Sequence, residues 1–127
     1  MQHDAVVIDS DGNVLYDSFA KHRKVRPGTL KNWLRNSYHG CLIAFKKEIV
    51  DCIVPLPISG CFHDQWIGMI ADTKENSVFI NDILMEYRRY DGNASSYVRE
   101  PFKVQLKKRI ITMINYIFYL LHLKKRI

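Results

Sequence analysis

The chain has 127 residues, of which 47% are hydrophobic and 12% aromatic, a composition that excludes a disordered protein and suits one small domain. The excess of positive charge is confined to one end of the chain. Residues 1–99 carry 12 basic and 12 acidic side chains, whereas residues 100–127 carry seven basic residues and one acid, Glu100. A basic tail of this kind suits an anionic membrane surface or a nucleic acid.

The cysteines, Cys41, Cys52 and Cys61, form no even-numbered disulfide framework. Their spacing also lacks the paired cysteines of structural zinc sites. The chain opens with no basic-then-apolar signal region, so we expect a cytoplasmic location. The apolar stretch 110–123 is interrupted by polar residues and is shorter than the roughly 20 residues that a membrane-spanning helix needs.

The first elements are short. The β-branched run Ala5–Ile8 predicts a buried strand, and Asp9–Asn13 is a turn from which Val14–Tyr16 returns as a second strand. The string Asp9-Ser10-Asp11 is assigned to turn chemistry in preference to metal ligation, because Asp and Asn favour turns. Residues 17–27 are polar and basic and are expected to form a loop.

A helix is expected next, over residues 29–36. Thr29 is its predicted N-cap, and Leu30, Trp33 and Leu34 are predicted to share its apolar face. Gly40–Phe45 is apolar and begins with glycine, so it is predicted to be a buried strand.

The middle of the chain predicts two more helices. The first covers 46–53, with Ile49, Val50 and Ile53 facing inward, and Pro55–Gly60 then breaks regular structure. The second covers 63–72 and buries three apolar residues, Trp66, Ile67 and Ile70.

Two short strands, Ser77–Ile80 and Ile83–Tyr87, and a polar loop from Tyr90 to Ser96 are predicted to follow. The longest helix candidate begins at Phe102. Its apolar residues recur at three- and four-residue spacing, as in an amphipathic helix, and are Leu106, Ile110, Met113, Ile114, Ile117 and Leu121.

Four segments occur in an order that resembles the second, acceptor-side half of bacterial family 2 glycosyltransferases, in particular the rhamnosyltransferase-like branch. They are the glycine-led Gly40–Glu48, the proline-rich Pro55–Pro57, the string His63-Asp64-Gln65-Trp66 and the segment Tyr87–Asn93. The likeness covers about residues 4–96. The chain departs from the pattern at Tyr90, where the family usually has histidine, and a protonated tyrosine is a poor metal ligand.

The resemblance implies an α/β fold, a partial GT-A-like domain with a small mixed sheet and flanking helices. Residues 1–100 would be the acceptor-side half of the catalytic domain, and 101–127 a basic amphipathic C-terminal helix. The implied activity is inverting transfer of a sugar, rhamnose being one candidate, from a nucleotide sugar to a saccharide or lipid-linked acceptor. The nucleotide-binding half is expected either to be absent or to be supplied by a companion chain, and without it the chain would be inactive.

Asp64 is the expected catalytic base, since an inverting transfer needs a carboxylate to accept the proton of the attacking hydroxyl. By its position alone Asp64 is more readily an N-cap or first-turn acid favoured by the helix dipole, and it is the family pattern around it that favours the base. His63 either orients Asp64 or contacts the donor phosphates, or it is a partly exposed loop histidine. Trp66 is either a stacking platform for a sugar or, as its place on the helix favours, a core residue.

Arg88, next to Tyr87, either pairs with diphosphate oxygens or lies solvated at a strand end. Gly40 either lets the backbone approach a ligand or simply permits a tight turn. Both Tyr87 and Gly40 are predicted to bind substrate. The complete enzyme is expected to use a divalent metal, Mn²⁺ or Mg²⁺, although no ligand set for it is assigned to this chain.

The tail is open to two readings. It either packs on another domain or lies as a basic amphipathic helix at the membrane interface, which would place the protein at the inner face of the cell membrane. Nucleic acid is not an expected partner, because the aromatic residues of 101–127 lie among aliphatic ones. A different class of function is also kept open, a catalytically inactive remnant that binds a membrane surface or a protein partner.

Overall fold

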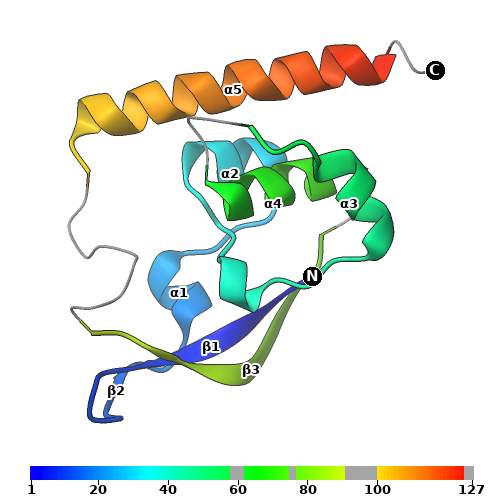
Figure 1. The fold of residues 1–127 in the computed structure, drawn as a ribbon. Coiled ribbons are helices and arrows are strands. Elements are labelled where there is room, and N and C mark those ends of the chain that lie inside the picture. Colours follow the sequence, from blue (N-terminus) through cyan, green and yellow to red (C-terminus); the bar gives the residue numbers. More distant parts are fainter. Residues whose placement is uncertain (58–61, 75–76, 91–99, 125–127) are drawn as a thin grey trace.

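The structure, a computed structural model, describes residues 1–57, 62–74, 77–90 and 100–124. It is an α/β fold in which helices flank one small mixed sheet. Figure 1 shows the sheet at one end of the molecule, α2, α3 and α4 in the middle, and α5 lying across the far side. The described elements are β1 (Gln2–Ile8), β2 (Val14–Tyr16), α1 (Phe19–Arg23), α2 (Thr29–Leu34), the 3₁₀ helix η1 (Gly40–Leu42), α3 (Lys47–Ile53), α4 (His63–Lys74), β3 (Phe79–Arg88) and α5 (Phe102–Lys124).

The sheet has the strand order β2-β1-β3, with β2 antiparallel and β3 parallel to the central strand. The predicted hairpin of β1 and β2 is confirmed. Its turn is closed by Asp9, whose amide donates to the Asn13 carbonyl at 2.9 Å and whose Oδ1 accepts from the Asn13 amide at 2.8 Å. Gly12 has a φ of 91°, a conformation that favours glycine.

The prediction of two short strands after residue 76 is wrong. A single strand, β3, runs through the polar pair Asn81-Asp82, both of which are exposed. The ladder with β1 pairs Gln2 with Phe79 at one end and Ile8 with Arg88 at the other, with register shifts near Asp4. Backbone pairing along β1 therefore holds one strand together where the side-chain pattern suggested a break.

Two clusters of buried apolar residues form the core. One joins β1 to its covering segments through Ala5, Val7, Phe19 and Leu42. The other joins α3 to α4 through four residues, and Tyr116 and Tyr119 of α5 pack against it. The four buried residues are Ile49, Ile53, Trp66 and Ile70.

Residues 17–27 are not entirely loop, because they contain the short helix α1. Ser18 caps this helix, its Oγ accepting from the Lys21 amide at 3.0 Å. The buried Asp4 carboxylate on β1 accepts from the Ser18 hydroxyl and from the Ala20 amide. A polar residue inside the central strand thus anchors α1. This tertiary contact cannot be predicted from the local sequence.

The strand predicted over Gly40–Phe45 is also wrong. Its first three residues form η1, and its only described pairing with the sheet is an isolated antiparallel bridge between Ile43 and Gln2. The Gln2 side chain holds the preceding segment instead, since it donates to the Ser37 carbonyl at 3.1 Å and accepts from the His39 amide at 3.0 Å. These side-chain bonds position the segment that leads into η1.

Helix α2 begins where predicted, but its N-cap is Gly28, with a φ of 110°, and not Thr29. The predicted apolar face is wrong as well, because Leu30 is 62% exposed and Leu34 is 47% exposed. The buried residue of α2 is Asn32, which donates from Nδ2 to the Gln65 carbonyl at 3.1 Å. Polar contacts therefore join α2 to α4.

Helix α3 buries Ile49 and Ile53 as predicted, whereas Val50 is exposed. In α4, Trp66 and Ile70 are buried and Ile67 is half-buried, close to the prediction. The end of the predicted breaker segment and most of the predicted polar loop, residues 58–60 and 91–96, lie outside the described residues.

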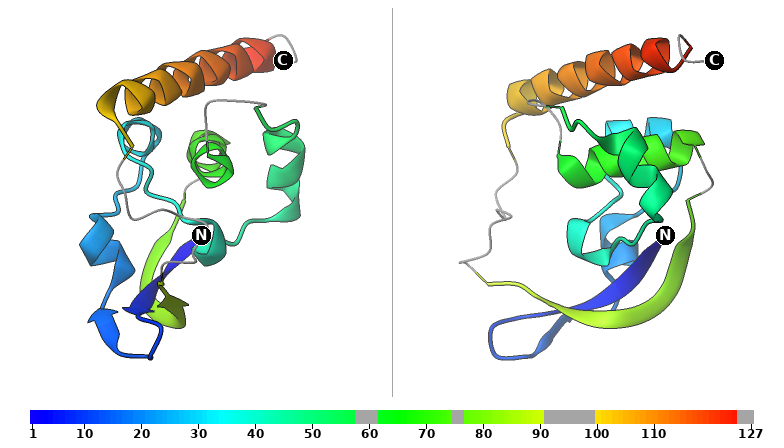
Figure 2. Two further views of the ribbon diagram at one scale, coloured as in Figure 1. Left: turned by 60° about the vertical axis from the view of Figure 1, so that its left-hand side comes forward. Right: turned by 45° about the vertical axis from the view of Figure 1, so that its right-hand side comes forward.

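Helix α5 confirms the predicted C-terminal helix, but most of its apolar stripe faces away from the protein. Figure 2 shows α5 lying over α2 and α4 in both further views. The side of α5 that meets them carries Thr112, which is fully buried, and the half-buried Tyr116 and Tyr119. No helix within the described ranges combines the length and the apolar character needed to cross a membrane.

Candidate functional site

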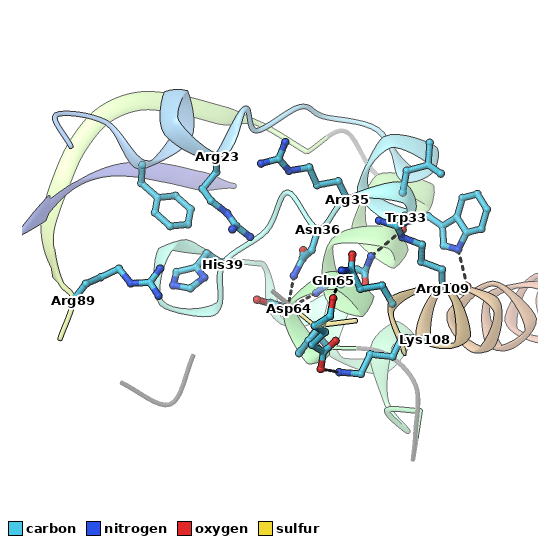
Figure 3. A pocket seen from close by; sticks show the side chains of 15 residues that line it. Arg23, Trp33, Arg35, Asn36, His39, Asp64, Gln65, Arg89, Lys108 and Arg109 are labelled. Carbon is cyan, nitrogen blue, oxygen red and sulfur yellow. Dashed lines mark hydrogen bonds and ion pairs between the residues drawn. The ribbon is translucent and has the colours of Figure 1, made fainter. Parts of the chain in front are cut away.

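A pocket of about 510 Å³ opens where α1, α2, α4 and α5 converge. Figure 3 shows its side chains gathered around Asp64, with Arg23, His39 and Arg89 on one side and Trp33, Lys108 and Arg109 on the other. The lining residues are Phe19, Arg23, Trp33, Leu34, Arg35, Asn36, His39, Phe62, Asp64, Gln65, Arg89, Glu100, Gln105, Lys108 and Arg109.

Asp64 lies in the first turn of α4 and is 9% exposed. One carboxylate oxygen, Oδ1, accepts from the Asn36 amide group at 3.0 Å and from the Gln65 backbone amide at 2.7 Å. The other oxygen, Oδ2, receives no hydrogen bond from any residue in the described ranges. Asp64 is therefore oriented through one oxygen and presents the second as a proton acceptor.

The charges around Asp64 are mostly positive. Among the described residues that line the pocket, five are basic and one other carboxylate, Glu100, is present and paired with Lys108. Burial and the neighbouring charges of Arg35 and Arg89 lower the pKa of Arg23 below its ordinary value. Arginine stays protonated in proteins, so this repulsion is relieved when an anion enters between the guanidinium groups. The basic lining residues are Arg23, Arg35, Arg89, Lys108 and Arg109.

His39 forms an aromatic part of the pocket wall. Its ring centroid lies 4.9 Å from that of Phe19 and 4.9 Å from that of Tyr87. Burial lowers the pKa of His39, although the nearby Asp64 acts in the opposite direction. At neutral pH the imidazole is therefore uncharged, and the positive charge of the pocket comes from the arginines and Lys108.

The family resemblance implies a divalent metal, and the residues of this pocket do not suit one. Mg²⁺ and Mn²⁺ take oxygen ligands, chiefly carboxylates. Of the two carboxylates among the described lining residues, Glu100 is paired with Lys108, and the basic lining residues repel a cation. Across the described part of the chain, no three His, Cys, Asp or Glu side chains are placed to hold a metal.

The residues predicted to surround Asp64 mostly lie elsewhere. His63 is exposed at the start of α4, next to Gly40, where an added Cβ would lie 3.1 Å from the His63 Nε2. Neither residue lines the pocket. Trp66 is 4% exposed in the core and donates from Nε1 to the Ile53 carbonyl at 3.3 Å, so its ring is not a platform for a sugar.

Tyr87 and Arg88 end β3 on opposite faces of the sheet. Tyr87 is half-buried against the core and against His39, behind the pocket wall. Arg88 donates from Nη1 to the Ser10 carbonyl at 2.7 Å, which directs it to the hairpin turn. Of the two adjacent arginines, it is the next residue, Arg89, that lines the pocket. Successive residues of a strand point in opposite directions, so a shift of one position exchanges the two arginines.

Several pocket residues were not predicted from the sequence. Asn36 and His39 follow α2 in a segment without a recognisable motif, and Lys108 and Arg109 belong to a tail interpreted only as a basic helix. A signal for Arg35 does exist in the basic character of residues 21–35. That character does not reveal which side chains turn toward Asp64.

Comparison of the chain with protein-family models, with curated proteins and with solved structures found no match. We therefore infer the function from the geometry and charge of the pocket.

Proposed function

We propose that this chain is the acceptor-side part of an inverting glycosyltransferase of GT-A-like architecture, with Asp64 as its general base. The proposal rests above all on one observation, a buried and oriented carboxylate in a pocket that is otherwise positively charged. Such a site can hold a substrate that carries several negative charges and can also remove a proton from a neutral one. A nucleotide sugar and a sugar hydroxyl meet these two requirements.

In the proposed reaction the acceptor hydroxyl approaches the Oδ2 of Asp64. Its oxygen attacks the anomeric carbon of the donor sugar while Asp64 takes the proton. The bond between the anomeric carbon and the diphosphate oxygen breaks on the opposite side, so the configuration at the anomeric carbon is inverted. The nucleoside diphosphate leaves with the bonding electron pair. The products are the glycosylated acceptor, the nucleoside diphosphate and the proton held by Asp64.

The basic residues stabilise the negative charge that grows on the leaving diphosphate. Arg23 and Arg35 lie on the α1 and α2 side of the pocket, and their planar groups suit paired phosphate oxygens. Pre-oriented positive groups that meet developing charge are among the largest contributions to catalysis. Asn36 supports this arrangement by fixing the Asp64 carboxylate.

Titration calorimetry tests the anion site. It measures the binding of a nucleoside diphosphate to the isolated chain without added metal. Loss of one charged hydrogen-bonding group costs about 1.5–3 kcal/mol, so Arg23→Gln and Arg35→Gln are each expected to weaken binding by roughly 10- to 100-fold. Arg26→Gln is the matched control, since Arg26 belongs to the same basic segment but does not line the pocket. Equal affinities for all three variants would contradict the proposed site.

Transfer itself is measured as release of nucleoside diphosphate from a nucleotide sugar, with the chain alone or with a companion chain that supplies the donor domain. Asp64→Asn keeps the shape of the side chain and removes the base, so turnover is expected to fall by roughly 10²- to 10⁴-fold. Diphosphate affinity should be kept or rise, because the variant removes a negative charge that repels the phosphates and removes no phosphate contact. Turnover near the wild-type rate in Asp64→Asn would rule out this residue as the base.

A further inference from the structure

The outer side of α5 is a continuous apolar surface, here called the outer face. Its residues follow one another at helical spacing, so they lie on one side of the helix. Each of them is between 43% and 57% exposed. The outer face consists of Leu106, Ile110, Ile114, Ile117, Phe118 and Leu121.

The inner side of α5 is held in place by specific contacts along its length. Trp33 donates from Nε1 to the Arg109 carbonyl at 2.8 Å. The Tyr116 hydroxyl lies 2.7 Å from the Thr73 hydroxyl, and the Tyr119 ring meets Trp66 edge-on at 5.9 Å. Rotating the helix to hide its outer face would break these polar and aromatic contacts. The outer face is therefore a fixed feature of the fold.

Charge indicates what covers the outer face. Residues 101–127 carry seven basic side chains and no acid. Two of them, Lys103 and Lys107, are exposed and share the face with Ile110 and Ile114, because they precede these residues by one to three helical turns. Pairing of two copies through this face would bring two acid-free helices together and leave their lysines without partners. An anionic lipid surface offers both hydrocarbon for the apolar residues and negative charge for the lysines.

We propose that α5 docks on an anionic membrane surface through its outer face and lies in the plane of the interface. Its 23 residues give it a length of about 34 Å. Sunk to a depth of roughly 5–10 Å, the apolar residues would reach the acyl chains while Lys103 and Lys107 stay among the headgroups. The inference does not depend on glycosyl transfer, since it uses only the orientation and charge of α5.

Docking would also fix the position of the candidate pocket. Gln105, Lys108 and Arg109 line the pocket from the first turns of the same helix. A membrane that covers the outer face would therefore lie one helix diameter, roughly 10–12 Å, from this wall of the pocket.

Co-sedimentation of the full chain with vesicles tests the proposal. The probe is a titration with vesicles of phosphatidylcholine alone and of phosphatidylcholine with phosphatidylglycerol. The wild-type chain should partition to the mixed vesicles and be released by salt. The double variant Ile114→Gln/Phe118→Gln should reduce its partition coefficient by roughly 10-fold or more, because two half-exposed apolar side chains lose their burial in lipid.

Two further variants separate apolar insertion from charge and from general surface hydrophobicity. Lys103→Gln/Lys107→Gln should weaken binding to the anionic vesicles by roughly 10-fold and leave the weak binding to neutral vesicles unchanged. Val78→Gln/Leu84→Gln is the matched apolar control, because Val78 is 54% and Leu84 is 61% exposed outside α5, and it should bind like the wild type. Far-UV circular dichroism verifies that every variant keeps its helices.

Three outcomes would overturn the proposal. One is a wild-type chain that stays in the supernatant with both vesicle types. Another is Ile114→Gln/Phe118→Gln binding as tightly as the wild type. The third is sedimentation velocity that shows a dimer dissolved by Ile114→Gln/Phe118→Gln while vesicle binding is absent, which would assign the outer face to a second copy.

Discussion

Gly68 in the middle of α4 lies against Tyr38, in the segment that leads to η1. A Cβ built on Gly68 would lie 2.0 Å from Cδ2 and 2.2 Å from Cε2 of Tyr38, far inside the contact distance of about 3.5–4.0 Å. Tyr38 is 6% exposed, and its hydroxyl donates to the Asp72 carboxylate at 2.7 Å. The Gly68→Ala variant therefore has to displace a buried and hydrogen-bonded ring.

Two opposing terms set the size of the effect. Alanine is favoured over glycine inside a helix by about 1 kcal/mol. Overpacking a dense contact costs about 1–3 kcal/mol, and loss of a hydrogen bond from Tyr38 to the charged Asp72 costs about 1.5–3 kcal/mol. Steric displacement outweighs helix propensity, and we expect Gly68→Ala to lower the free energy of unfolding by about 2 kcal/mol. For a chain of this size the melting temperature should fall by roughly 6–8 °C.

Urea denaturation followed by circular dichroism measures this change, and a second background isolates its cause. In a Tyr38→Ala chain the ring is absent, so adding Gly68→Ala should be neutral or stabilising by about 1 kcal/mol. The coupling between the two substitutions is then the cost of the clash. If Gly68→Ala stabilised the chain with Tyr38 present, the close approach of α4 to this ring would be refuted.

Two other predictions concern the pocket wall and the core. Burial lowers the pKa of His39, so below its ordinary value near 6.5 the unfolded chain takes up a proton that the folded chain resists. The free energy of unfolding should therefore fall between pH 7.5 and 5.5 in urea titrations, and His39→Phe should flatten this slope; an unchanged slope would contradict the assignment. Trp66→Ala should cost about 3–5 kcal/mol of stability and Trp66→Phe clearly less, with diphosphate affinity unaffected in Trp66→Phe. A Trp66→Phe chain of normal stability that fails to bind would instead restore Trp66 to the site.

Local pattern was sufficient for the elements that depend on near neighbours. The hairpin of β1 and β2 follows from a β-branched run and an Asp-Gly-Asn turn, and α3, α4 and α5 follow from apolar spacing and proline boundaries. The sequence pattern gave wrong predictions where a side chain distant in the sequence determines the backbone conformation. The Gln2 side chain holds the segment before η1, and Asp4 holds α1. A single sequence gives no sign of such partners more than a dozen residues away.

The candidate site divides in the same way. Asp64 is singled out through the resemblance carried by His63-Asp64-Gln65-Trp66, because its position after a proline-rich loop and at a helix start is also that of a first-turn acid. The residues that surround Asp64 could not be identified from the sequence. Arg23, Arg35 and Arg89 come from three separate segments, and whether Arg88 or Arg89 enters the pocket depends on the register of β3 against β1. Register is set by backbone pairing across the sheet and not by the identity of the two arginines.

Helix α5 shows the division most clearly. Sequence alone determined that residues from Phe102 onward form a basic amphipathic helix without acidic residues, because the spacing of apolar residues and the charge are properties of the local sequence. Tertiary structure alone decided which side faces the protein. The helix packs through the hydroxyl groups of Thr112 and Tyr116 and through the ring of Tyr119, which find partners on α4 or within α5, and it leaves the aliphatic stripe outside. A helical repeat fixes which residues share a side, whereas the shape and polar groups of the neighbouring helices select the side that is buried.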